Sequence, residues 1–168
     1  MNQMTLTIGS LTCIGILTFS VNTLLLNRQK LNYETEATIT GVSIGQAIIE
    51  EITVKSFDDN FTGTKYTDDS TLFVPPAMLG VDSAETAGDN ETFNDVDDYN
   101  AHIRSVVTPR YGNYSARCEV SYVTASSPME PAATQTFLKR IDVYVKNPFI
   151  PSPDSTLKVS KLISYRYK

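Results

Sequence analysis

The chain has no tryptophan, one histidine and two cysteines, and its first 27 residues contain no charged side chain. With so few histidines and cysteines, the chain has few side chains suited to nucleophilic or metal-dependent catalysis, and we do not expect an enzyme. Cys13 and Cys118 lack the CxxC spacing of a redox or zinc motif, and no disulfide is expected between them. His102 has no neighbouring nucleophile and is expected at the surface or at a helix end. The net charge of −5 and the pI near 4.8, without a basic stripe, argue against nucleic acid as a partner.

The uncharged residues 1–27 predict a single hydrophobic helix. From Met4 to Leu26 nearly every residue is apolar, small, Ser or Thr. A helix of about 23 residues is roughly 35 Å long, which exceeds the hydrocarbon thickness of about 30 Å. We therefore expect this segment to lie in a lipid bilayer or to pack against copies of itself as a filament core. The side chains expected to make that contact are Leu6, Ile8, Leu11, Ile14, Leu17, Val21, Leu24 and Leu25.

The flanks of the hydrophobic segment are unusual for a secretory signal peptide. Nothing basic precedes the segment, whereas Arg28 and Lys30 follow it directly. A signal peptide has the opposite arrangement, with a basic region first and a small-residue cleavage site afterwards. By the positive-inside rule, a chain that began at Met1 would keep its C-terminal side in the cytoplasm. Because the later domain has the features of an exported one, we expect that a short basic leader has been removed in front of Met1.

Residues 28–56 are expected to continue the helix with an amphipathic character. Isoleucines recur three or four residues apart, with charged residues between them, so that one side of the helix is apolar. This stripe comprises Ile44, Ile48, Ile49 and Ile52. Gly41 and Gly45 are expected to weaken this half by up to about 1 kcal/mol each relative to alanine. Packing against a domain, rather than intrinsic helix propensity, should therefore hold it.

The rest of the chain, residues 57–168, reads as a loop followed by a sheet. Residues 57–115 are rich in Asp, Thr, Ser, Gly and Asn and predict a variable loop, in which Leu72–Val74 forms a short strand or pins the loop to the domain. Residues 116–168 contain three runs with a period of two, separated by proline-rich breaks, and such runs predict an antiparallel meander with one dry face. The expected fold is α+β, with one long N-terminal α-helix packed on a C-terminal antiparallel β-sheet. Residues 28–168 would form the globular domain.

This arrangement resembles the type IV pilin family and its relatives, the pseudopilins of type II secretion. The shared features are the uncharged N-terminal segment, its amphipathic continuation, the variable loop and the C-terminal sheet. Residues 93–100, FNDVDDYN, are also similar to a segment of minor and MSHA-type pilins. The resemblance implies leader removal by a prepilin peptidase and insertion in the inner membrane. It further implies export by pilus assembly machinery into an extracellular helical homopolymer that serves adhesion, motility or DNA uptake.

The sequence departs from the pilin pattern at its N-terminus. Most pilins have glutamate as the fifth mature residue, where it pairs with the N-terminus of a neighbouring subunit. This chain has Thr5, and its first acidic residue is Glu34. Either Met1 is not the mature start, or Met1 and Thr5 dock without that charge pair, with Thr5 or Thr7 accepting a hydrogen bond from the amine. A minor pilin, a pseudopilin and, from another class, a monomeric membrane-anchored surface binding module are the alternatives to a major pilin.

Two further features suggest ligands or modifications. The carboxylates of Asp95, Asp97 and Asp98 could present oxygens to Ca²⁺, although the spacing and glycine of an EF-hand are missing. The competing interpretation is a solvated loop in which Asp97 or Asp98 caps a short helix. No other cofactor is expected. Sequons predict candidate glycosylation sites in loops or at strand edges, namely Asn60, Asn90 and Asn113.

Overall fold

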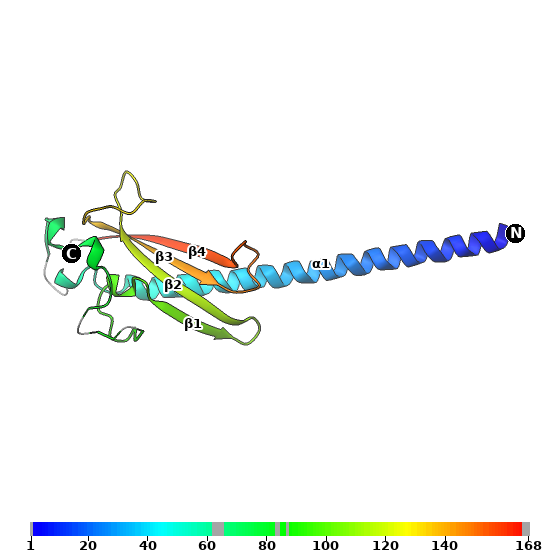
Figure 1. Cartoon of the computed structure of the whole chain (residues 1–168), viewed down its shortest axis with the longest axis horizontal. Coiled ribbons are helices and arrows are strands. Elements are labelled where there is room, and N and C mark those ends of the chain that lie inside the picture. Colours follow the sequence, from blue (N-terminus) through cyan, green and yellow to red (C-terminus); the bar gives the residue numbers. More distant parts are fainter. Residues whose placement is uncertain (1, 62–65, 83–84, 87, 166–168) are drawn as a thin grey trace.

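One uninterrupted helix, α1 (Asn2–Thr53), runs along most of the molecule, and a sheet lies beside its C-terminal half (Figure 1). The computed structural model describes residues 2–61, 66–82, 85–86 and 88–165. After α1, these residues include the 3-10 segments Asp59–Phe61, Ser70–Leu72, Pro76–Met78 and Asp97–Tyr99. The strands are β1 (Ile103–Thr108), β2 (Gly112–Tyr122), β3 (Leu138–Lys146) and β4 (Thr156–Ser164).

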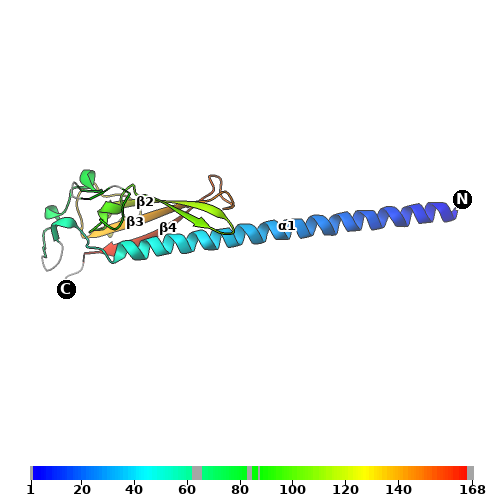
Figure 2. The ribbon, with the colours of Figure 1, turned by 90° about the horizontal axis from the view of Figure 1, so that it is seen from below.

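The four strands form an antiparallel meander in the order β1-β2-β3-β4. Val120 of β2 lies opposite Ile141 of β3, and Val143 of β3 lies opposite Val159 of β4. Consecutive strands can pair in this way because short connections suffice between antiparallel neighbours. The sheet covers one side of α1 (Figure 2). The expected α+β arrangement of a long N-terminal helix on an antiparallel sheet is confirmed.

The hydrophobic core lies between α1 and the facing side of the sheet. Three of the four predicted stripe residues, Ile48, Ile49 and Ile52, are buried there, and Ile44 packs at its edge. The alternating residues of β2 and β3 supply the opposite wall, which comprises Tyr114, Ala116, Cys118, Val120, Ile141, Val143 and Val145. Period-two patterning therefore identified the dry face of the two central strands correctly.

Gly41 and Gly45 have a different role from the one expected. They lie where the helix contacts β4, and a Cβ atom added at Gly45 would lie 2.8 Å from Cγ2 of Val159. A Cβ at Gly41 would lie 2.7 Å from Cδ2 of Leu157. These glycines are therefore required for close packing of the helix on the sheet, rather than being only weak points of the helix.

The sheet begins earlier in the chain than predicted. The expected loop of residues 57–115 contains all of β1 and the start of β2, while α1 ends at Thr53 rather than at residue 56. β1 is an edge strand whose side chains Ile103 and Val107 point to solvent, with exposed fractions of 62% and 78%. Its apolar residues thus do not follow the inward alternation that signals a strand, which explains why the sequence pattern missed it.

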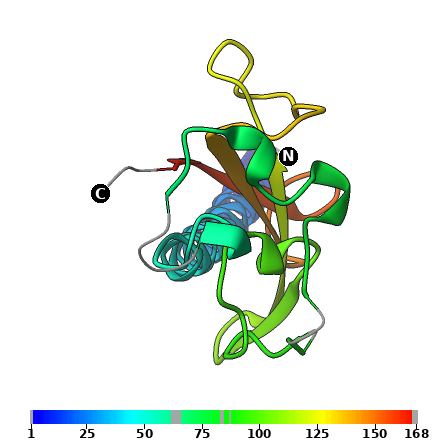
Figure 3. The same ribbon diagram turned by 90° about the vertical axis from the view of Figure 1, so that its left-hand side faces the viewer.

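The linking segment between α1 and β1 gathers at the end of the molecule away from the N-terminus (Figures 1 and 3). Phe73 is buried there, with its ring centroid 5.1 Å from that of Tyr165 and 5.3 Å from that of Phe57. The predicted apolar patch at Leu72–Val74 therefore pins the segment to the domain and does not form a strand. Edge-to-face rings of this kind contribute about 0.5–1.5 kcal/mol per pair beyond their buried area.

Candidate functional site: the projecting helix

The N-terminal part of α1 extends well beyond the sheet (Figures 1 and 2). Every described side chain from Gln3 to Tyr33 is exposed, so we call residues 2–32 the projecting segment. At a rise of 1.5 Å per residue this segment is roughly 45 Å long, against a bilayer hydrocarbon core of about 30 Å. By length and composition α1 is able to cross a membrane, with a mean hydropathy of 1.7 in its most apolar window.

Residues 4–26 of the projecting segment are apolar around most of the helix circumference, and Arg28 and Lys30 follow them. The eight side chains predicted to make the contact are all exposed, by 52% to 74%. A helix about 10 Å wide and 35 Å long, the length of residues 4–26, has a lateral surface of roughly 1,100 Å². The largest apolar patch on a typical soluble monomer is only about 300–600 Å². At about 25 cal/mol per Å², covering this surface is worth on the order of 30 kcal/mol, so the segment requires an apolar environment.

The described hydroxyl side chains of the projecting segment form their hydrogen bonds within the helix. The hydroxyls of Thr18, Ser20 and Thr23 donate to backbone carbonyls four residues earlier, at 2.8 to 2.9 Å. Thr7, Ser10 and Thr12 donate to carbonyls three residues earlier, each at 2.9 Å. An unpaired donor costs several kcal/mol in a medium without water. These internal bonds therefore fit the segment for lipid or for a packed helical bundle.

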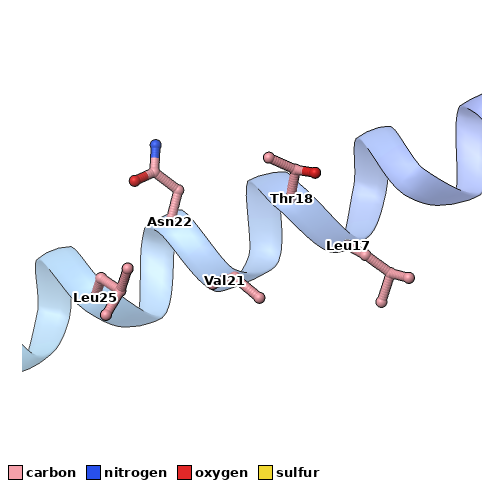
Figure 4. A pocket seen from close by; sticks show the side chains of 5 residues that line it. All are labelled: Leu17, Thr18, Val21, Asn22 and Leu25. Atoms are coloured by element: carbon pink, nitrogen blue, oxygen red, sulfur yellow. The ribbon is translucent and has the colours of Figure 1, made fainter.

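A shallow hollow lies midway along the projecting segment. It is lined by Leu17, Thr18, Val21, Asn22 and Leu25, with Thr18 and Asn22 pointing to one side of the helix and Leu17 and Val21 to the other (Figure 4). Asn22 introduces an amide into an otherwise apolar surface. In helical bundles a single amide of this kind selects one register, because any other register leaves it without a partner.

A collar fixes the sheet to the helix at the point where the projecting segment begins. Nη1 of Arg110, in the β1–β2 turn, lies 2.6 Å from Oε2 of Glu36, and the Arg110 guanidinium lies over the ring of Tyr33. The Tyr111 hydroxyl donates to Glu36, and the Tyr114 hydroxyl donates to the carbonyl of Ala37 at 3.1 Å. We call these residues the collar. It holds the domain in one orientation relative to the helix.

A second network ties the other end of α1 to the sheet. Arg104 of β1 donates two hydrogen bonds to the Glu51 carboxylate, each at 2.8 Å. The Tyr99 hydroxyl and the Asn90 amide donate to the same carboxylate at 2.9 and 2.7 Å. The hydrogen bonds from Arg104 lower the pKa of Glu51 to about 2. His102, expected at the surface or at a helix end, is buried beside this network against the rings of Phe93 and Tyr99.

The predicted calcium ligands lie together, and most of their oxygens accept hydrogen bonds from the protein itself. Asp98 accepts from the backbone N–H groups of Asn94 and Asp95, both at 2.9 Å, and Asp95 accepts from the N–H of Asp97 at 2.8 Å. Asp97 is paired with the ammonium group of Lys139 at 2.7 Å. Across the described ranges, no group of three His, Cys, Asp or Glu side chains is arranged to hold a metal ion. The predicted helix cap at Asp97 or Asp98 is not formed, because it is the side chain of Asp95 that accepts from the N–H groups of Asp97 and Asp98 at the start of the 3-10 segment. Calcium binding stays a prediction.

The remaining predicted positions are not brought together. Met1 lies outside the described residues, and so does the side chain of Thr5, so the predicted N-terminal docking contact stays a prediction. Asn60 and Asn113 are exposed, whereas the Asn90 amide is half-buried in the Glu51 network. Among the described residues, sequence reasoning missed Lys139. Lys139 is buried on the same face of β3 as Ile141, Val143 and Val145. The period-two alternation of these residues, extended by two positions, would have predicted this.

Comparison of this chain with protein-family models, with curated proteins and with solved structures returned no match.

Proposed function

We propose that this chain is a structural subunit of an extracellular helical filament of the type IV pilus kind, polymerising through the projecting segment. The observation that carries the proposal is the uncovered apolar surface of that segment, with its hydroxyls bonded internally. A bilayer would cover this surface before assembly, and identical subunits would cover it afterwards. Because both environments are apolar, transfer from one to the other requires little net free energy, and the assembly machinery supplies the remaining work.

Two features favour a filament over a simple membrane anchor. The helix continues without a linker from the projecting segment into the core of the domain, and the collar keeps the domain in one orientation. Identical rigid subunits that make one repeated head-to-tail contact generate a helical polymer. At Gly9 and Gly15 an added Cβ would meet nothing within 4 Å in the single chain, which leaves room for close approach of neighbouring helices.

The proposal places the subunit in the inner membrane before assembly and in a surface filament afterwards. Its partners would be identical subunits, a prepilin peptidase and the inner-membrane assembly machinery. The filament would serve adhesion, surface motility or DNA uptake. A minor pilin or secretion pseudopilin, and a monomeric membrane-anchored binding module, are the two alternatives that the following experiment separates from a major subunit.

Cryo-electron microscopy of fibres sheared from producing cells tests the proposal. We expect thin fibres whose central density is a bundle of helices about 50 residues long, surrounded by four-stranded domains. Fibres of another protein with this chain at low copy would indicate a minor pilin. If the chain remains entirely as single copies in the membrane fraction, the polymer proposal is wrong.

A charge on the projecting segment should block assembly. Leu17→Glu places a carboxylate in the helix bundle at a cost of about 3 kcal/mol per subunit, equivalent to roughly a 100-fold weaker subunit-addition constant. The matched control is Met129→Glu, because Met129 is 80% exposed on a loop of the domain. We expect sheared fibres from the control and none from Leu17→Glu, measured by immunoblot of the sheared and membrane fractions. Normal fibres from Leu17→Glu would show that the projecting segment is not the polymer core.

A further inference from the structure

Three segments that are distant in sequence meet around the side chain of Lys139, at the end of the sheet. Lys139 is fully buried on β3. Its Nζ donates to the carbonyl of Phe57 at 2.6 Å, just after α1, and to Oδ1 of Asp97 at 2.7 Å, in the 3-10 segment. The rings of Phe57 and Tyr122 lie 4.7 and 5.1 Å from the ammonium nitrogen. A lysine and an aspartate are thus held in contact in a site that excludes water.

Asp95 adds an unexplained group to this site. Its side chain is buried, with Oδ1 accepting backbone hydrogen bonds from Asp97 and Asp98. Its other oxygen, Oδ2, has no hydrogen-bond donor in the described part of the chain. The Asp97 carboxylate lies within hydrogen-bonding reach of Asp95, and burial together with the charge of Asp97 raises the pKa of Asp95 far above its ordinary value. A proton on Oδ2 resolves the missing partner, because the resulting carboxylic acid donates to Asp97.

We propose that Lys139 and Asp97 form an intramolecular isopeptide bond, with Asp95 as the acid that transfers protons during the reaction. This site is independent of filament formation. A nitrogen 2.7 Å from one carboxyl oxygen lies roughly 3.5 Å from the carboxyl carbon, which is the separation of a near-attack arrangement.

The reaction balances without an external reagent. The Lys139 ammonium first gives a proton to the Asp97 carboxylate, which leaves a neutral amine and a carboxylic acid. The Nζ electron pair then attacks Cγ of Asp97 while Asp95 protonates the hydroxyl group that leaves as water. The C–O bond breaks, the amide forms, and the surplus proton on the nitrogen returns to Asp95. One water is lost, and nothing is oxidised or reduced.

Burial favours this reaction at Lys139 over other lysine–carboxylate contacts. An ion pair removed from water carries a large desolvation penalty, and amide formation removes both charges. Lys158 also contacts a carboxylate, Asp142, at 2.9 Å, but the Lys158 side chain is 42% exposed and its charge is solvated. Asp58 is 3.6 Å from Lys139, and its Oδ2 already accepts from Val74 N–H and the Tyr122 hydroxyl. Asp97 is therefore the electrophile that the geometry selects.

The test is the mass of the denatured, detergent-extracted full chain. We expect a deficit of about 18 Da, one water, relative to the Lys139→Met variant after allowing for the substitution. Tryptic digestion should release a branched peptide that joins the segments around Asp97 and Lys139. In Asp97→Asn, Asp95 takes the Lys139 proton in place of the missing carboxylate and passes it to the leaving group, which is ammonia, so we expect a deficit of about 17 Da.

Two matched variants distinguish the proposed role of Asp95 in proton transfer from the role of Asp98 in accepting backbone hydrogen bonds. Asp95→Asn keeps the oxygen that accepts the backbone hydrogen bonds but removes the acidic proton, so we expect the full mass. Asp98→Asn keeps the oxygen that accepts its own backbone hydrogen bonds and should retain the deficit. Near-ultraviolet circular dichroism checks that each variant is folded. If a variant does not fold, the mass of the wild-type chain alone shows whether the isopeptide bond forms. A full-mass wild-type chain, or a water loss that maps to a succinimide at another aspartate, would overturn the proposal.

Discussion

The Glu51 network gives a prediction that can be worked out quantitatively. The pKa of Glu51 is lowered from 4.5 to about 2 by hydrogen bonds from Arg104, Asn90 and Tyr99. Taken in full, that difference corresponds to about 3 kcal/mol of folding stability at neutral pH. The Glu51 side chain is 31% exposed, so solvent screens part of the interaction. We therefore expect Glu51→Gln to lower the free energy of unfolding by about 1–2 kcal/mol at pH 7.

The pH dependence identifies the cause of this loss. A carboxylate whose pKa is lower in the folded state stabilises the protein above its unfolded pKa, and the stabilisation disappears as the pH falls through the folded value. The difference between wild type and Glu51→Gln should thus be constant above about pH 5 and shrink between pH 4.5 and about 2. Below that range both side chains are neutral and of the same shape.

The assay is urea unfolding of the detergent-solubilised full chain, followed by near-ultraviolet circular dichroism of its nine tyrosines. The control is Glu50→Gln, because Glu50 is exposed on the same helix turn, and its substitution should change stability by less than about 0.5 kcal/mol. Equal stability of Glu51→Gln and wild type at pH 7 would refute the network argument. A difference that persists unchanged at pH 2.5 would assign the loss to packing instead of charge.

Two further outcomes follow from the packing of the domain. Gly45→Ala should lower the free energy of unfolding in the same urea assay by about 1–2 kcal/mol, because overpacking against Val159 outweighs the gain in helix propensity. Gly15→Ala, where an added Cβ meets nothing within 4 Å, should not lower it, and a loss at both positions would contradict the close-approach argument. Burial raises the pKa of the Cys118 thiol to about 11. In a Cys13→Ser background, a maleimide should therefore label Cys118 only in urea, as measured by mass, and labelling of the folded domain would contradict its burial.

Local periodicity in the sequence was sufficient to predict the helix, the core faces of β2 and β3, and the apolar surface of the projecting segment. In each case a single repeat, 3.6 or two residues long, carries the information. Ile103 and Val107 show where this fails, because an edge strand with outward apolar side chains has no inward alternation to detect. The apolar pattern predicted that the segment needs a covering, but it contains no information on what covers it.

Contacts between distant segments could not be predicted from the sequence. Gly45 reads as a helix-weakening residue until β4 is placed against it, because the backbone distance to Val159 is a property of the fold. Lys139 and Asp97 lie on separate elements, and their pairing depends on the route of the linking segment past the end of the sheet. The acidic cluster consequently suggested a cation from solution, whereas the protein supplies its own cation from β3.

The side-by-side packing of α1 and the sheet determines how the chain would carry a load applied to its projecting segment. The strands run roughly along the helix (Figure 1), so a pull on the projecting end acts parallel to the contact between them. The core contacts between Ala37 and Ile52 are then loaded together in shear. The helix approaches the side chains of Leu157 and Val159 closely at Gly41 and Gly45. These side chains would therefore resist sliding of the helix along β4. Tension along the helix axis is thus distributed over the whole interface instead of being concentrated at one end.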